Sequence, residues 1–127
     1  MDTVRLLVVD DDRGNCTLVS KFLTDRGYRV DTAYDGNRAI QLAEQNTYNL
    51  AVLDYQMPGI DGVETYKRIR EIQPGMVGIF VTAFTTLDTV YPAIAAGVER
   101  VLPKPVQLDE LLGLVETMAG KPESTRI

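Results

Sequence analysis

The sequence predicts an α/β domain in which a parallel five-stranded sheet lies between two layers of helices. Five short aliphatic runs recur along the chain, and stretches with helical spacing of apolar residues separate them. Three of these runs are nearly continuous in Val, Leu and Ile, which is typical of strands that are covered on both faces. Because crossovers between parallel strands are right-handed, five strand–helix units are expected to form an open sheet with helices on both sides.

The boundaries of the elements follow from these patterns. The five predicted strands are 5–9 (RLLVV), 29–33 (RVDTA), 49–53 (NLAVL), 77–81 (VGIFV) and 100–102 (RVL). In the first predicted helix, the spacing of residues favours an inward face made of Asn15, Leu18, Val19, Phe22 and Leu23. The last predicted helix ends near Met118 and presents Leu108, Leu111, Leu112 and Val115 on one face.

Length and composition are those of one folded domain. The chain has 127 residues, of which 45% are hydrophobic, and this is enough for one core but not for a second domain. After Met118 the sequence AGKPESTRI loses helical periodicity and gains polar residues, Pro and Gly. We therefore expect the domain to span residues 1–119 and residues 120–127 to form a flexible tail or the start of a linker.

Charge and residue usage exclude several classes of function. The net charge is -5 and Lys and Arg are not clustered, so neither a nucleic acid nor an anionic membrane surface is an expected partner. Histidine is absent, which excludes histidine-based catalysis and most zinc sites in this chain. Cys16 is the single cysteine, the residues after Met1 lack the charged-then-apolar pattern of a signal sequence, and no apolar run approaches roughly 18 residues. We expect a cytoplasmic protein.

Polar residues follow four of the predicted strands. In open α/β sheets, ligands bind at the carboxyl ends of the strands, so these residues are expected to meet at one site. They are Asp10, Asp11 and Asp12 after the first strand, Asp54 after the third, Thr82 after the fourth, and Lys104 in LPKP after the fifth.

The chemistry of this set favours a divalent cation and a phosphoryl group. Several carboxylates without His or Cys are typical ligands of a hard cation, and Mg²⁺ is the predicted ion. A lysine and a hydroxyl near the same ion are suited to bind phosphoryl oxygens, and an aspartate among them can act as a nucleophile toward phosphorus.

The motifs VVDDD, LDYQMPGIDG, VTA and LPKP, in this order and at these strand ends, resemble the receiver domain of two-component response regulators. The resemblance covers about residues 4 to 118. It implies a three-layer, flavodoxin-like sandwich with five helices and the strand order 2-1-3-4-5. It also implies a phosphoacceptor signalling domain in a phosphorelay, which phosphorylates and dephosphorylates only itself and is otherwise not an enzyme.

The resemblance assigns a role to each residue of the site. Asp54 accepts the phosphoryl group, and Asp10 and Asp11 form the acidic pair that holds Mg²⁺, Asp11 directly and Asp10 largely through water. Asp54 and the backbone carbonyl of Gln56 complete the protein's share of the metal ligands. Lys104 contacts the phosphoryl oxygens together with Thr82, and the Lys104–Pro105 bond is expected to be cis, as is common in the family.

The resemblance also implies partners. The phosphoryl group comes from a phosphohistidine on a sensor histidine kinase or on a histidine phosphotransfer protein. A downstream protein or effector domain is expected to bind the face formed by helix 4, strand 5 and helix 5, and a homodimer is compatible with the family. No direct contact with nucleic acid or membrane is implied.

Three positions depart from the family or bear on its switch. The family usually has Tyr or Phe three residues before the lysine, and here that residue is Val101, which has no ring to turn inward. Pro92 falls inside the predicted fourth helix, so that helix either begins late, near Tyr91, or is kinked. Phe84, two residues after Thr82, is expected to screen the phosphoryl group from water.

Asp12 is predicted to have a structural role, because it falls where the first helix begins and can cap its free amides, worth about 1 kcal/mol.

Three other functions remain open from the residues alone. A phosphatase with an aspartate nucleophile needs a second acid where Gln56 stands, and a flavin mononucleotide binder needs a phosphate loop where DDDRGN would repel phosphate. A docking module would leave the acidic site inert.

Overall fold

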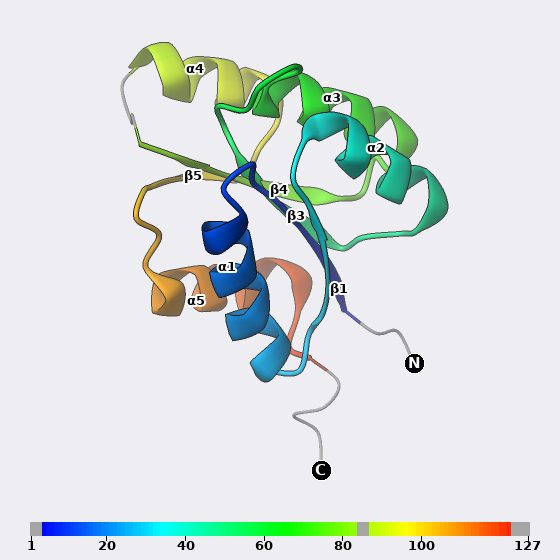
Figure 1. Cartoon of the computed structure of the whole chain (residues 1–127), viewed down its shortest axis with the longest axis vertical. Helices are drawn as coiled ribbons and strands as arrows, with labels where there is room; N and C mark the ends of the chain where they lie inside the picture. Colours follow the sequence, from blue (N-terminus) through cyan, green and yellow to red (C-terminus); the bar gives the residue numbers. More distant parts are fainter. Residues whose placement is uncertain (1–3, 84–86, 123–127) are drawn as a thin grey trace.

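The computed structural model describes residues 4–83 and 87–122 and contains one parallel sheet between two layers of helices (Figure 1). The strands run in the order β2-β1-β3-β4-β5, and every neighbouring pair is parallel. The predicted fold class and strand order are confirmed. The strands are β1 (Arg5–Val9), β2 (Arg29–Ala33), β3 (Leu50–Asp54), β4 (Val77–Thr82) and β5 (Arg100–Pro103).

The helices divide between the two faces of the sheet, with α1 and α5 on one face and α2, α3 and α4 on the other (Figure 1). Because both faces are covered, successive residues of a central strand enter opposite cores: Leu7 packs with α2 and α3, whereas Leu6 packs with α1 and α5. The helices are α1 (Arg13–Asp25), α2 (Gly36–Gln45), α3 (Gly62–Ile72), α4 (Leu87–Ala95) and α5 (Leu108–Ala119).

Three helices begin at an aspartate cap. The side chains of Asp12, Asp35 and Asp61 each accept a hydrogen bond from the backbone N–H three residues later, at 3.0, 2.8 and 2.9 Å. Each such cap satisfies an amide that the helix itself leaves free and contributes about 1 kcal/mol. The predicted capping role of Asp12 is confirmed.

The inward face of α1 differs from the prediction at three positions. Asn15 and Leu18 were expected inside and are exposed, Leu18 to 55%, whereas Cys16, which the predicted face did not include, is fully buried. The helix presents Cys16, Val19 and Leu23 to the sheet, with the Cys16 thiol 3.7 Å from the carbonyl oxygen of Val8. This rotation brings a small side chain, rather than leucine, against the closely approaching backbone of β1.

The fourth helix contains its proline rather than beginning after it. α4 starts at Leu87, so the alternative of a late start near Tyr91 is wrong. Pro92 lies on the exposed side of the helix, where water can bond the carbonyl that the proline nitrogen leaves without a donor. The helical pattern continues after it, because the N–H of Ala96 bonds the carbonyl of Pro92 at 3.0 Å.

The chain after α5 stays in contact with the domain for at least three residues. The Tyr28 hydroxyl donates a 2.8 Å hydrogen bond to the carbonyl of Gly120, and Pro122 is buried. The rest of the predicted tail, residues 123–127, lies outside the described residues, and the domain boundary at residue 119 stays a prediction. Among the described helices, none has the length and apolar character needed to cross a membrane.

Candidate functional site

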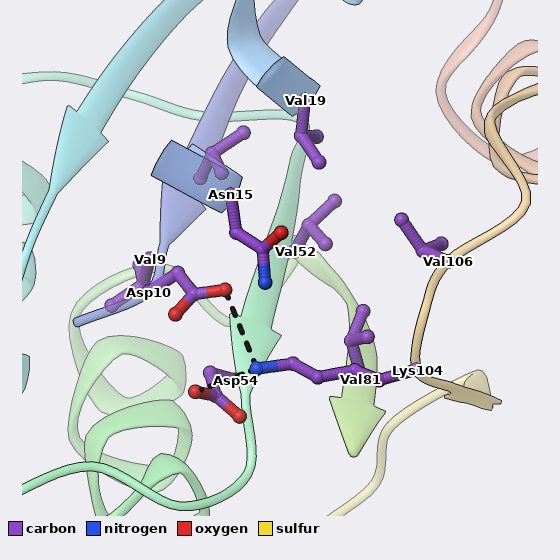
Figure 2. Close-up of a pocket in the computed structure, with 10 residues that line it drawn as sticks. Val9, Asp10, Asn15, Val19, Val52, Asp54, Val81, Lys104 and Val106 are labelled. Atoms are coloured by element: carbon purple, nitrogen blue, oxygen red, sulfur yellow. Dashed lines mark ion pairs between the residues drawn. The ribbon is translucent and has the colours of Figure 1, made fainter. Parts of the chain in front are cut away.

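The carboxyl ends of β1 and β3 and the loop after β5 bring three predicted site residues into direct contact (Figure 2). The Lys104 ammonium lies 3.1 Å from an Asp54 carboxylate oxygen and 3.5 Å from an Asp10 oxygen. Asp54 and Asp10 are buried, at 7% and 8% exposure. Residues separated by almost the whole chain therefore form one charged cluster, because parallel strands deliver their carboxyl ends to the same edge.

The three consecutive aspartates after β1 have three different environments. Asp10 is buried and accepts a 2.9 Å hydrogen bond from the backbone N–H of Asp12. Asp11 is exposed, and the exposed side chain of Asp12 caps α1. Of the three carboxylates, Asp12 is thus directed to a helix end, whereas Asp10 and Asp11 remain available to the site.

The loop after Asp54 is held against the end of β3 by a close backbone approach at Gly62. A Cβ atom at this position would collide with the carbonyl oxygen of Asp54, and the Gly62 N–H bonds the carbonyl of Tyr55 at 2.9 Å. Glycine is therefore required where α3 begins. On the other side, the backbone N–H of Gln56 lies 3.4 Å from an Asp54 carboxylate oxygen, at the long limit of a hydrogen bond.

Burial disfavours the ionised form of the Asp54 carboxyl, and this is what we call the strained carboxylate. Removal from water, followed by the nearby charge of Asp10, raises the pKa of Asp54 to about 6 although Lys104 acts in the opposite direction. Burial alone would lower the pKa of Lys104, but the hydrogen bond and charge of Asp54, with those of Asp10, outweigh it and raise this pKa. One ammonium shared by two buried carboxylates leaves an excess of negative charge, which favours binding of a further cation.

The donor set of the site fits a hard divalent cation. Carboxylate oxygens of Asp10, Asp11 and Asp54 all lie within 4.8 Å of one another. These are all oxygen donors, and Mg²⁺ typically binds to one or two carboxylates, retains several waters and uses phosphate oxygens as further ligands. The predicted acidic cluster is thus present, and the metal-binding role of the Gln56 carbonyl stays a prediction.

Thr82 and Lys104 are joined by a backbone hydrogen bond between the end of β4 and the loop after β5. Thr82 ends β4 and is 2% exposed, and its carbonyl accepts a 2.8 Å hydrogen bond from the backbone N–H of Lys104. The Lys104–Pro105 bond is cis, as predicted. Val101 is half-buried and is paired with Phe80 in the β4–β5 register. Phe84, expected at the rim, lies outside the described residues.

A small cavity of about 30 Å³ lies beneath the charged cluster. Its wall is mostly valine, and Asn15 lines it beside Asp10, Asp54 and Lys104, with its amide directed toward the charged groups in Figure 2. Asn15 thus lies next to the charged groups of the site. The aliphatic wall of the site was not predicted, and its only sequence signal is the recurrence of valine immediately before the strand ends.

Comparison with known proteins finds the same family throughout. The family model described as the response regulator receiver domain matches residues 6–116. The chain is 35% identical over 119 residues to the transcriptional regulatory protein ZraR of Klebsiella oxytoca, covering 93% of this chain and 27% of ZraR. It is also 35% identical to the response regulator MprA of Mycobacterium sp. (strain KMS), covering 91% and 50%. The chain thus spans from about a quarter to half of the length of these curated relatives.

Solved structures give the same result over nearly their full length. A receiver domain protein (CheY-like) from Methanospirillum hungatei superposes with a TM-score of 0.87 at 28% identity, covering 91% of this chain and 93% of that one. The chemotaxis protein CheY4 of Vibrio cholerae has a TM-score of 0.87 at 28% identity, with 92% and 99% covered. The fold and the arrangement of the strand ends are therefore shared with these proteins.

Proposed function

The chain belongs to the response regulator receiver domain family, and from that premise we propose that Asp54 accepts a phosphoryl group from a phosphohistidine on a partner protein. The reaction depends on Mg²⁺ and switches a protein-interaction surface. The observation that carries this proposal is the buried Asp54 carboxylate, 3.1 Å from the Lys104 ammonium and adjacent to the two further carboxylates of a cation site.

The proposed transfer is a displacement at phosphorus by Asp54. A carboxylate oxygen of Asp54 forms the new P–O bond while the P–N bond to the partner's histidine breaks, and the electron pair of that bond stays on the imidazole nitrogen, which takes up a proton. Because the nucleophile is the ionised carboxylate, a pKa of about 6 leaves most Asp54 reactive at neutral pH. Burial also weakens solvation of that carboxylate.

Lys104 and Thr82 stabilise the charge that arrives with the phosphoryl group. The Lys104 ammonium already bonds an Asp54 oxygen, so a small movement transfers one of its three donors to a phosphoryl oxygen. The Thr82 hydroxyl, at the end of the neighbouring strand, is proposed to donate to a second phosphoryl oxygen. Both interactions grow in strength during the transfer, because charge develops on these oxygens.

Asp10, Asp11, Asp54 and the backbone carbonyl of Gln56 are proposed to hold Mg²⁺. When bound, the ion neutralises part of the charge on the carboxylates and on the phosphoryl oxygens. Asp10 accepts the backbone N–H of Asp12 with one oxygen and faces Lys104 with the other, so its orientation is fixed before any cation binds. Asp11 is exposed and supplies a carboxylate that solvent and a hydrated ion can reach.

The proposed partners follow from the family. A sensor histidine kinase or a histidine phosphotransfer protein supplies the phosphoryl group, and a downstream protein or effector domain binds the face of α4, β5 and α5. Support for this face comes from Tyr91 and Ile94 of α4, which are 67% and 59% exposed. We also propose that the protein works in the cytoplasm, that it removes its own phosphoryl group by hydrolysis, and that it can form a homodimer.

The test uses a small phosphodonor in place of the kinase. The protein is incubated with acetyl phosphate and Mg²⁺, and its intact mass is measured. We expect a phosphoryl adduct in the wild type and in Asp31→Asn, and none in Asp54→Asn. Asp31 serves as the control because it is also a partly buried aspartate paired with a cation but lies away from the site. An adduct that persists in Asp54→Asn would overturn the proposal.

A further inference from the structure

The structure contains a row of three aromatic rings that leads from the acidic site to the end of α4. Tyr55 follows Asp54 directly, and its ring meets Phe80 edge to face, with centroids 5.9 Å apart and planes at 89°. Phe80 meets Tyr66 in the same manner, at 5.7 Å and 74°. The three rings come from the loop after β3, from α3 and from β4, three consecutive parts of the chain that the fold packs against one another.

At the site, this row begins on firmly held backbone. The Tyr55 N–H bonds the carbonyl of Val81 at 3.0 Å, and the Tyr55 carbonyl accepts from Gly62 at 2.9 Å. Phe80 is fully buried and lies two residues before Thr82 on the same strand, so both side chains leave β4 toward the same face. Phe80 is therefore the ring through which a movement of Thr82 or of the loop after Asp54 would enter this row.

At its far end, the row is hydrogen-bonded to Gly97, two residues after the end of α4. The Tyr66 hydroxyl donates to the carbonyl of Gly97 at 3.1 Å and accepts a 2.6 Å hydrogen bond from the Arg70 guanidinium. Gly97 has a φ of 97° and ends the helix. Among the α4 side chains that the structure describes, those of residues 90–95, Ala93 alone is buried. The bond from Tyr66 thus joins this end of the helix to α3, in addition to the packing of Ala93.

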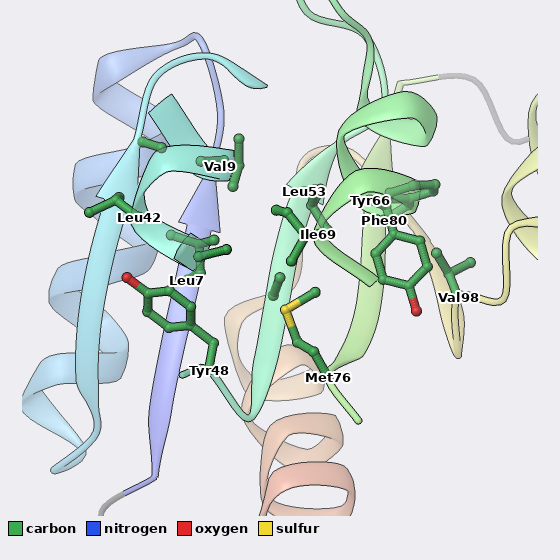
Figure 3. Packing of buried hydrophobic residues seen from close by; sticks show 14 of the residues in the cluster. Leu7, Val9, Leu42, Tyr48, Leu53, Tyr66, Ile69, Met76, Phe80 and Val98 are labelled. Carbon is green, nitrogen blue, oxygen red and sulfur yellow. The ribbon is translucent and has the colours of Figure 1, made fainter. Parts of the chain in front are cut away.

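The ring of Tyr66 is fixed between its neighbours. A Cβ atom at Gly78 of β4 would collide with the Tyr66 ring, so the ring crosses the strand at the one residue type that leaves room for it. Figure 3 shows Tyr66 and Phe80 together, with the tyrosine hydroxyl directed toward the side of Val98. Because rings in a close-packed core move together rather than deform, displacement of Phe80 is passed to Tyr66.

We propose that Tyr66 is a positioning residue for the switch, which couples the state of Asp54 and Thr82 through Phe80 to the carboxyl end of α4. The inference rests on the proposed function, since it concerns how phosphorylation reaches the interaction surface. A route through Tyr66 is needed because β5 offers no large side chain at the corresponding place. Val101 is paired with Phe80 and lines a hollow of about 210 Å³ against α4, and its short side chain leaves this space unfilled.

The chain offers a matched control for Tyr66. Tyr28 is buried in the other core, and its hydroxyl donates to the carbonyl of Gly120, the glycine that follows α5, at 2.8 Å. Tyr28 and Tyr66 thus make the same kind of bond, from a buried ring to a glycine carbonyl at a helix end. Tyr28→Phe removes the same group as Tyr66→Phe without touching the three rings.

The experiment has one arm without phosphorylation and one arm with it. Hydrogen exchange is measured first on the unmodified proteins, where Tyr66→Phe is expected to speed exchange of the Val98 amide about fivefold through loss of the hydrogen bond to the Gly97 carbonyl. NMR amide shifts of Gly97 and Val98 are then recorded before and after treatment with acetyl phosphate and Mg²⁺. We expect the shift change on phosphorylation to fall severalfold in Tyr66→Phe and in Phe80→Leu, and to be retained in Tyr28→Phe.

The adduct mass separates the two proposals. If Tyr66→Phe carries the Asp54 adduct and Gly97 and Val98 still respond as in the wild type, the coupling through Tyr66 is wrong while the phosphoacceptor role stands. If the wild type forms no Asp54-dependent adduct, the proposed function fails, and the coupling fails with it. Normal phosphorylation with a lost response at α4 supports both.

Discussion

Asp54 and Asp31 are two partly or fully buried aspartates that each face one cation, yet their pKa values move in opposite directions. Asp31 accepts from the Tyr48 hydroxyl at 2.6 Å and from two nitrogens of Arg5 at 2.8 and 3.2 Å. Burial would raise its pKa, but the hydrogen bonds from Tyr48 and Arg5 outweigh burial and lower it. Asp54 shares Lys104 with Asp10, and burial raises its pKa to about 6.

The difference lies in how completely each carboxylate is satisfied. Around Asp31, three donors serve one carboxylate, and its ionised form stabilises the fold. Around Asp54, one ammonium serves two carboxylates, and the ionised form is held at a cost until a cation or phosphoryl group changes the local charge. The first arrangement stabilises the β1–β2 pair, whereas the second leaves a carboxylate with incomplete charge compensation at the edge of the sheet.

The largest expected effect comes from removing the Lys104 side chain beside Asp54. Lys104→Ala should lower the rate of phosphoryl transfer to Asp54 by roughly 100-fold, because the ammonium that stabilises the charge of the transferring phosphoryl group is lost. The rate is followed by the appearance of the adduct mass with acetyl phosphate and Mg²⁺. Lys21→Ala, which removes an exposed lysine paired with Asp25 away from the site, is the control. Equal rates for the two variants would contradict the role of Lys104.

The second prediction concerns the satisfied aspartate. Asp31→Asn should lower the free energy of unfolding at pH 7 by about 2 kcal/mol, since it removes charge-assisted hydrogen bonds to Arg5. A lowered pKa means that this stability is present above the unfolded value of 3.8 and is lost as the pH falls through the lower folded value. Urea denaturation at several pH values checks it, and a difference that does not shrink in acid would contradict the pairing.

The third prediction concerns Asp54, where the dependence of stability on pH is opposite to that at Asp31. Because the folded pKa of Asp54 is raised, the wild type loses stability as the pH rises from the unfolded value of 3.8 through about 6. Asp54→Asn avoids this loss and should make the metal-free protein more stable by roughly 1–2 kcal/mol above pH 6. Urea denaturation in the presence of a chelator measures the difference, and an Asp54→Asn variant less stable than the wild type at pH 7.5 would contradict it.

The smallest expected effect separates Asp12 from its two acidic neighbours. Asp12→Ala should cost about 1 kcal/mol of stability through loss of the α1 cap and should leave Mg²⁺ affinity within about twofold. Asp35→Ala removes an equivalent cap from α2, away from the site, and is expected to cost as much. Calorimetric titration with Mg²⁺ measures the affinity. If Asp12→Ala lowered the free energy of Mg²⁺ binding by more than it lowered the free energy of unfolding, Asp12 would belong to the metal site.

Much of the fold was predictable because the relevant signals are local. The five strands lie within one residue of their predicted ends, since continuous aliphatic runs have few alternatives in a chain with both sheet faces covered. Asp10, Asp54 and Lys104 were predicted to meet because parallel strands deliver their carboxyl ends to one edge. The cap at Asp12 followed from its place at the start of a helix.

The remaining features depend on packing between distant segments. The rotation of α1 that buries Cys16 and exposes Leu18 is set by how closely the helix approaches β1, and leucine and cysteine are both acceptable inside by pattern alone. The pairing of Tyr66 with Gly78 joins a helix to a strand across the core. The shifted pKa of Asp54 depends on burial and on distances that no sequence pattern contains.

The central claim is that the strained carboxylate of Asp54 is the phosphoacceptor. Its most direct test is borohydride reduction of the protein after treatment with acetyl phosphate and Mg²⁺, followed by peptide mass spectrometry, because borohydride converts an aspartyl phosphate to homoserine. The account predicts homoserine at position 54 and unmodified aspartate at positions 10, 11, 12 and 31. Homoserine at another aspartate, or none at position 54 while an adduct is present, would contradict it.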